Sequence, residues 1–179
     1  MNEQKKALRG EIRARQREMT EAYARSAGDR IQERILASAG YREAGSVLLY
    51  LHTTLEPATD RILRQALADG KRVYVPKCVG REMLAVRFNG TEGLRPGAFG
   101  IPEPETWAET ATADALDLIL VPCLAASPDG RRLGHGGGYY DRFLAGKRGR
   151  TVCLCFRRMM MENIPMGEQD IWMDEVVTE

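Results

Sequence analysis

A run of glycines between two charged residues is the part of this sequence most suited to chemistry. Four glycines fall within the five positions from Gly134 to Gly138, and the segment begins with Arg132 and ends with Asp141. Closely spaced glycines allow successive backbone N–H groups to turn toward one bound anion. Arg132 adds a fixed positive charge, and Asp141 adds a carboxylate of the type that holds Mg²⁺. We therefore interpret the segment as a phosphate-binding loop with a place for a metal ion.

The elements on either side would position this loop. An apolar stretch over residues 118–121, stopped by Pro122, predicts a buried strand. Residues 139–144 predict the first turns of a helix, whose positive end would face the same anion. A glycine-rich loop after a strand can also be only a tight turn, so the loop alone leaves both interpretations open. No Gly-Lys-Ser/Thr follows Gly134 at the spacing of a P-loop, and Tyr139 replaces the third glycine of G-x-G-x-x-G, so a nucleotide site here would belong to another class.

The rest of the chain alternates predicted helices and strands. Thr20 is a predicted N-cap between the first two helices, and Gly40 a predicted C-terminal stop of the second. Residues 89–114 predict a long ordered loop with about one helical turn. This alternation predicts one three-layer α/β domain over residues 1–179, with a mostly parallel sheet, helices on both faces and an N-terminal helical pair. The predicted helices cover residues 3–19, 21–39 and 59–69, and the strands 47–51, 72–75, 84–88, 118–121, 152–156 and 175–177.

Composition excludes several classes of protein. The 26 basic and 25 acidic residues nearly balance, which favours neither nucleic acid nor an anionic membrane as a partner. No apolar run approaches the roughly 20 residues that cross a bilayer, and the charged N-terminal stretch is unlike a secretion signal. We therefore expect a cytoplasmic protein. Cys78, Cys123, Cys153 and Cys155 form no C-x-x-C pair and are expected to be reduced and buried, with disulfides or zinc as the alternatives.

Six segments, in order along nearly the whole chain, carry a family resemblance. They are Lys5-Lys-Ala-Leu-Arg9, Tyr50-Leu-His-Thr-Thr-Leu-Glu-Pro-Ala-Thr59, Gly70-Lys-Arg-Val-Tyr-Val-Pro76, Phe99-Gly-Ile-Pro-Glu-Pro104, the loop Arg132 to Asp141, and Ile164-Pro-Met-Gly-Glu-Gln-Asp170. Together they resemble the 5-formyltetrahydrofolate cyclo-ligases, also called 5,10-methenyltetrahydrofolate synthetases. The resemblance implies a ligase that forms a C–N bond, cyclising 5-formyltetrahydrofolate to 5,10-methenyltetrahydrofolate with ATP and Mg²⁺ and releasing ADP and phosphate. Such phosphoryl transfer needs positioning and fixed charge more than a protein nucleophile.

The resemblance also implies a role for particular residues. Asp141 and Asp170 would hold Mg²⁺, and Arg132 and Tyr140 would act in catalysis. ATP would be bound by Lys5, Arg9, Arg132, Leu133, Gly134, His135, Gly136, Gly137, Gly138, Tyr139 and Tyr140. Folate would be bound by Leu51, Glu56, His135 and Tyr139. The architecture points the same way, since ligands of open parallel sheets bind beyond the C-terminal ends of the strands.

Ordinary structural roles remain open for these residues. Lys5 and Arg9, four positions apart, would also suit a solvated helix face. Glu56-Pro57 is a common entry to a helix, and Asp141 could only favour a helix N-terminus.

The chain departs from the family at three positions. Ala126 and Ser127 stand where the family usually has an aromatic residue and an acid, and Met159 stands where glutamine is frequent. The small Ala126 is expected to widen the folate pocket. The alternative function is therefore a divergent, weakly catalytic member that binds nucleotide or folate. We expect a monomer that acts on small molecules.

Overall fold

The computed structural model describes residues 2–90, 94–96, 102–104 and 109–179 of the chain. A seven-stranded sheet with the order β11-β10-β7-β1-β2-β3-β6 forms its centre. The strands from β11 to β2 run parallel, whereas β2, β3 and β6 pair antiparallel. Their bounds are β1 Ser46–Leu48, β2 Arg72–Val79, β3 Glu82–Arg87, β6 Thr110–Ala111, β7 Leu118–Pro122, β10 Arg150–Leu154 and β11 Glu175–Val177.

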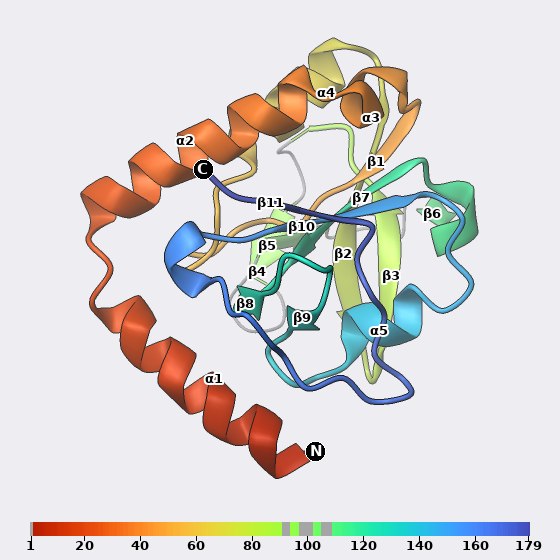
Figure 1. The fold of residues 1–179 in the computed structure, drawn as a ribbon. Helices are drawn as coiled ribbons and strands as arrows, with labels where there is room; N and C mark the ends of the chain where they lie inside the picture. Colours follow the sequence, from red (N-terminus) through yellow and green to blue (C-terminus); the bar gives the residue numbers. More distant parts are fainter. Residues whose placement is uncertain (1, 91–93, 97–101, 105–108) are drawn as a thin grey trace.

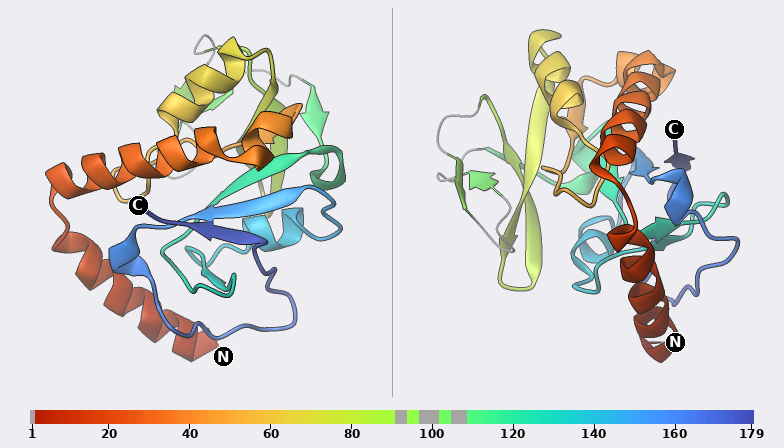
Figure 2. Two further views of the ribbon diagram at one scale, coloured as in Figure 1. Left: turned by 45° about the horizontal axis from the view of Figure 1, so that its top comes forward. Right: turned by 90° about the vertical axis from the view of Figure 1, so that its left-hand side faces the viewer.

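Helices cover both faces of this sheet. Figure 1 shows α2, α3 and α4 on one side, and α5 with the small β8–β9 ribbon on the other. The left-hand view in Figure 2, turned so that the top of Figure 1 comes forward, also shows α1 extending away from α2. The predicted fold class, a mostly parallel sheet with helices on both faces and an N-terminal helical pair, is therefore confirmed. The bounds are α1 Asn2–Arg17, α2 Glu21–Ala37, α3 Ala39–Glu43, α4 Asp60–Ala68, α5 Tyr139–Phe143, β8 Ala125–Ala126 and β9 Arg132–Leu133.

A threonine and a serine cap the N-termini of α2 and α3. Thr20 caps α2 as predicted, because its side chain accepts a hydrogen bond of 3.2 Å from the Tyr23 N–H. The predicted stop at Gly40 is wrong. Ser38 ends α2, and its Oγ accepts from the Tyr41 N–H at 3.1 Å, so a short helix begins there and Gly40 lies inside it.

The first strand is shorter than predicted and the second is longer. β1 ends at Leu48, and the Tyr50 carbonyl accepts from Thr59 Oγ1 at 2.6 Å instead of continuing a ladder. β2 continues to Val79, where it pairs with Glu82 of β3 in an antiparallel hairpin. A long-range partner therefore decides where β2 ends.

The predicted loop over residues 89–114 contains more structure than expected. A single helical turn is present at Ala113–Ala115, as predicted. Three short strands correct the prediction: β4 Leu94–Pro96 pairs antiparallel with β5 Pro102–Pro104, and β6 Thr110–Ala111 pairs antiparallel with β3. Residues 99–101, which begin one of the six family-like segments, lie outside the described residues.

The parallel strands supply the core. All the residues of β1 and β7 are buried, and so are the last four of β10. Cys123, Cys153 and Cys155 are buried thiols, as predicted, whereas Cys78 is only partly buried, which corrects the expectation for that residue. In the part of the chain that the structure describes, no helix is long and apolar enough to span a bilayer.

Candidate active site

A cavity of about 870 Å³ lies where the chain leaves the C-terminal ends of β1 and β7. Its wall also includes residues of α1, of the β2–β3 hairpin and of α5. The structure brings to this one cavity every site residue expected from the sequence, although their individual roles remain predictions. They are Lys5, Arg9, Leu51, Glu56, Arg132, Leu133, Gly134, His135, Gly136, Gly137, Gly138, Tyr139, Tyr140, Asp141 and Asp170.

The glycine loop has the backbone shape that its composition predicts. The φ angle is +108° at Gly136 and +67° at Gly138, a region that residues with side chains rarely adopt. Within the described residues, none of the five N–H groups from residue 134 to residue 138 donates a hydrogen bond to the protein. The loop therefore presents consecutive backbone donors beside the cavity, which is the requirement for binding an anion.

At three of the four loop glycines, a neighbouring side chain lies within 3 Å of where a Cβ would be. A Cβ at Gly134 would lie 2.9 Å from Arg132 Nη1, and a Cβ at Gly138 would lie 2.7 Å from Arg142 Nη1. At Gly137 it would lie 2.7 Å from Cε2 of the Tyr139 ring. The glycines thus permit close approach of arginine and tyrosine side chains as well as unusual φ angles.

Arg132 is a buried cation of the site. Its Nη2 lies 2.9 Å from Asp141 Oδ1, and only 7% of the residue is exposed. The guanidinium carbon lies 5.8 Å from the centre of the Tyr140 ring. Its Nε is buried and has no partner among the described residues. Arg132 is therefore held in place on one side and keeps a donor available.

Two carboxylates each keep one oxygen open. Asp141 Oδ1 accepts from Arg132 and from the Ile171 N–H, the latter at 3.2 Å. Asp170 Oδ2 accepts from Lys5 Nζ and from the Gly167 N–H. In the described part of the structure, Asp141 Oδ2 and Asp170 Oδ1 have no hydrogen-bond partner. Hard carboxylate oxygens of this kind suit Mg²⁺, which usually takes one or two of them together with phosphate oxygens and water.

The charge of Asp170 is stabilised by its surroundings. Burial opposes ionisation, but the Lys5 ammonium and the Gly167 N–H outweigh it, so the pKa of the Asp170 carboxyl lies below its usual value. Lys5 is only 9% exposed. The alternative of a solvated helix face is therefore wrong for Lys5. Arg9 is half-buried, so part of its side chain remains in contact with solvent. Arg9 Nε donates to the Gly134 carbonyl at 2.9 Å, which fixes α1 to the glycine loop.

Glu56 is an ionised acceptor at another part of the cavity. Its Oε2 accepts from the N–H and the hydroxyl of Thr53, each at 2.9 Å. Its Oε1 lies 3.2 Å from His135 Nε2. Burial alone would raise the pKa of Glu56. The hydrogen bonds with His135 and Thr53 lower the pKa by more than burial raises it, so the pKa lies below its usual value. Glu56 can therefore accept from a ligand's N–H donors as a carboxylate.

Tyr140 contributes a buried hydroxyl with no partner within the described ranges of the chain. Burial, and then the charge of Glu56, raise the pKa of this phenol far above its ordinary value. The group is therefore a neutral donor. An unpaired buried donor costs free energy, and a ligand in the cavity could satisfy it.

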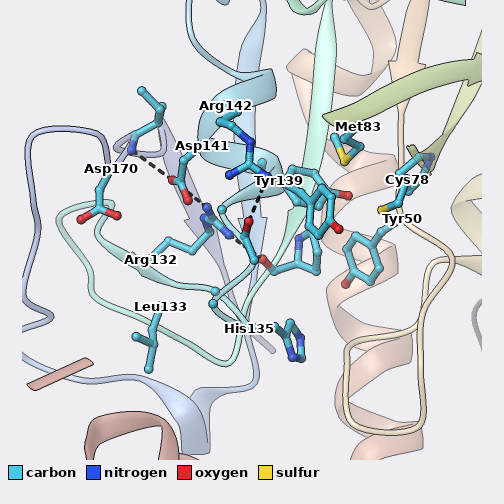
Figure 3. Close-up of a pocket in the computed structure, with 18 of the residues that line it drawn as sticks. Tyr50, Cys78, Met83, Arg132, Leu133, His135, Tyr139, Asp141, Arg142 and Asp170 are labelled. Carbon is cyan, nitrogen blue, oxygen red and sulfur yellow. Dashed lines mark hydrogen bonds and ion pairs between the residues drawn. The ribbon is translucent and has the colours of Figure 1, made fainter. Parts of the chain in front are cut away.

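Sequence reasoning missed the side of the cavity formed by the hairpin. Cys78 of β2 and Met83 of β3 line it, together with Tyr50. Figure 3 shows these three opposite Arg132 and Asp141. Alternation along a strand indicates which side chains share a face of the sheet. Only the antiparallel pairing of β2 with β3, however, places Cys78 and Met83 at the cavity.

The residues that depart from the family pattern lie elsewhere. Ala126 and Ser127 are fully buried, Met159 is 2% exposed, and none of the three is among the described residues that line the cavity. Ser127 Oγ donates to Asp129 Oδ1 at 2.6 Å and shapes a turn. The expectation that Ala126 widens a folate pocket is therefore wrong.

Comparisons with known proteins agree with one another. The model of the 5-formyltetrahydrofolate cyclo-ligase family matches residues 1–179. A probable 5-formyltetrahydrofolate cyclo-ligase of Caenorhabditis elegans is 33% identical over 82% of this chain and 79% of its own. The 5-formyltetrahydrofolate cyclo-ligase of Mus musculus is 27% identical over 100% and 95%. The solved 5,10-methenyltetrahydrofolate synthetase of Aquifex aeolicus superposes with a TM-score of 0.86 at 28% identity, covering 96% of this chain and 88% of that one.

Proposed function

The chain belongs to the 5-formyltetrahydrofolate cyclo-ligase family and is a 5-formyltetrahydrofolate cyclo-ligase, and we propose that the cavity described above is where it binds ATP and folate. The family is ATP-dependent. The observation that carries the proposal is the run of five backbone N–H groups over residues 134–138 that have no partner among the described residues. They lie next to the buried Arg132 and the two aspartates.

The reaction requires activation of a poor leaving group. The formyl group on N5 is an amide, and its oxygen leaves readily only after it has accepted the γ-phosphoryl group of ATP, with release of ADP. N10 then attacks the formyl carbon and loses its proton. The carbon–oxygen bond breaks, and phosphate departs with that oxygen. Positioned positive charge and backbone donors are what such a transfer demands of a protein.

We assign the phosphates of ATP to the glycine loop and to the cations around it. The N–H groups of residues 134–138 would donate hydrogen bonds to phosphate oxygens. Lys5, Arg9 and Arg132 would balance the negative charge of the phosphates. Arg132 would stabilise the negative charge that develops during transfer, and its Nε, which has no partner among the described residues, supports this role. The neutral hydroxyl of Tyr140 would donate to an oxygen at the reacting centre.

Asp141 and Asp170 are the residues that would hold Mg²⁺. Each has one oxygen fixed by protein donors and one open oxygen, which fits an ion that also needs phosphate and water ligands. Bound there, Mg²⁺ would neutralise phosphate charge. The ionised state of Asp170, favoured by Lys5, supports the assignment.

We assign the pterin to the side of the cavity that holds Glu56. Its ionised carboxylate would accept from the pterin N–H donors, and Leu51, His135 and Tyr139 would contact the ring or its substituent. Since all these groups come from one chain, we propose that the protein works as a monomer. We also propose that it acts in the cytoplasm, on these two small molecules.

The assay for this function mixes protein, MgATP and 5-formyltetrahydrofolate and follows the methenyl chromophore. We expect the chromophore to appear only when all three are present. Binding of ATP or folate without chromophore would instead support the alternative of a weakly catalytic binding protein.

A further inference from the structure

The side chain of Arg142 joins two walls of the cavity. It projects from α5, and its Nη2 donates to the Gly137 carbonyl of the glycine loop at 2.9 Å. Its Nε donates to the Arg81 carbonyl at the turn of the β2–β3 hairpin at 2.9 Å, and Nη2 also donates to that oxygen. One guanidinium therefore holds the glycine loop and the hairpin turn together.

The residues around Arg142 are arranged to allow this contact. A Cβ at Gly138 would lie 2.7 Å from Arg142 Nη1, so the missing side chain makes room for the guanidinium. The guanidinium carbon lies 5.3 Å from the centre of the Tyr139 ring. Tyr139 makes a second connection of the same kind, since its hydroxyl donates to the Gly80 carbonyl at 3.0 Å. Two neighbouring residues of α5 thus hold the same hairpin turn.

The two parts that Arg142 joins serve different sides of the cavity. The glycine loop lies on the side with Arg132 and Asp141, whereas the hairpin supplies Cys78 and Met83 on the opposite side (Figure 3). Within the described residues, the hydrogen-bond acceptors of Arg142 are neutral peptide carbonyls, and it forms no ion pair with an acid. These contacts are suited to fixing a geometry.

We propose that Arg142 is a positioning residue that sets the glycine loop and the β2–β3 hairpin against each other, so that both substrate subsites have their working shape. This inference rests on the proposed function. A residue that acts this way changes the affinity for both substrates, because it fixes the glycine loop assigned to ATP and the hairpin turn contacted by Tyr139, which is assigned to folate. Its loss is expected to have a small effect on global stability, because the residue is exposed.

The test compares Arg142→Met, Arg142→Lys and the control Arg64→Met. Methionine keeps an unbranched apolar stem but donates no hydrogen bond. Lysine can restore both contacts, because Nη2 alone reaches both carbonyls and one ammonium near that position has enough donors. Arg64 is an exposed arginine of α4 that forms an ion pair with Asp60, and it is not among the described residues that line the cavity.

We expect Arg142→Met to raise KM for both ATP and 5-formyltetrahydrofolate roughly tenfold, the scale of one or two lost hydrogen bonds. The same variant should change kcat by less than about threefold and should keep the wild-type Tm within a few degrees. Arg142→Lys should recover most of both losses, and Arg64→Met should match the wild type.

Three outcomes would overturn the inference. They are wild-type KM values in Arg142→Met, a rise in KM for one substrate alone, and global unfolding of that variant. A rise for one substrate would indicate direct contact with that ligand, and unfolding would indicate a general structural role. A wild-type protein that forms no methenyl product would instead refute the proposed function, whereas an active wild type with an unaffected Arg142→Met refutes only the role of Arg142.

Discussion

Arg132 and Asp141, nine positions apart, form an ion pair of 2.9 Å at the two ends of the glycine loop. Their side chains are 5% and 22% exposed, so solvent screens the pair only partly. The pair closes the loop at its base, and Pro122 at the end of β7 accepts a long hydrogen bond of 3.5 Å from the same guanidinium. The cation proposed to face the transferred phosphoryl group is thereby fixed before substrate arrives.

We predict that Arg132→Ala lowers kcat roughly a hundredfold or more, the scale measured for single fixed donors in active sites. Arg132→Lys should rescue little, because an ammonium cannot both hold Asp141 and keep a second donor in the guanidinium geometry. Steady-state kinetics would measure both, with Arg13→Ala on the exposed face of α1 as control. Full activity of the lysine variant would exclude the role of the guanidinium fork.

Gly136→Val and Gly138→Val should each abolish ATP binding and leave the protein folded. Valine resists the positive φ at these positions. Calorimetric titration with a non-hydrolysable ATP analogue would measure the loss. Gly70→Val is the matched control, since Gly70 has φ +70° but nothing within 4 Å of its absent Cβ, and it does not line the cavity. Unchanged ATP affinity in both loop variants would show that the loop does not hold phosphate.

Asp141→Asn and Asp170→Asn should each raise the Mg²⁺ concentration needed for half-maximal activity. The double variant should lose less than the sum of the two single losses, because both groups would serve one ion. Activity titrated against Mg²⁺ in the three variants would test this. Additive losses with an unchanged Mg²⁺ midpoint would show that these aspartates are structural.

Glu56→Gln should raise KM for 5-formyltetrahydrofolate roughly 10- to 100-fold, the scale of a lost hydrogen bond to a charged acceptor. Steady-state KM for ATP, which should change little, serves as the internal control. A variant with wild-type KM for folate would remove Glu56 from the pterin site.

The same substitution gives a stability difference that depends on pH. Because the pKa of Glu56 is lowered in the folded protein, ionisation stabilises the fold above the ordinary value of 4.5, and this contribution is lost as pH falls through the lowered pKa. The Tm of the wild type should therefore exceed that of Glu56→Gln near neutral pH, and the gap should narrow in acid below pH 4.5. A gap that stays constant into strong acid would contradict this account.

Local patterns in the sequence were sufficient for the parts of the fold that depend on local structure. Thr20 was found because an N-cap is a local feature, and the glycine loop because its spacing is local. The rule that ligands bind beyond the ends of parallel strands pointed to the same edge of the sheet, where the structure places Glu56 and the loop. Lys5 required the family resemblance, since nothing in α1 alone shows that its ammonium is buried against Asp170.

Features that depend on distant partners were not predictable in this way. The end of β2 at Val79 depends on pairing with β3, and the contacts of Arg142 depend on where that hairpin turns. Gly40 predicts a helix stop, because glycine often follows a helix. The Ser38 cap starts a new helix at the same place, and tertiary context decides between the two. Ala126 shows the same limit, because its burial away from the cavity follows from the β8–β9 pairing.

The central claim is that the backbone N–H groups of residues 134–138 bind the phosphates of ATP. The most direct measurement is the change in amide chemical shifts when MgATP or a non-hydrolysable analogue is added to the isotopically labelled protein. We predict large, saturable shifts for the amides of residues 134–138, and none for Gly70 in its distant turn. Saturable binding of ATP that leaves the amides of residues 134–138 unmoved would contradict the account.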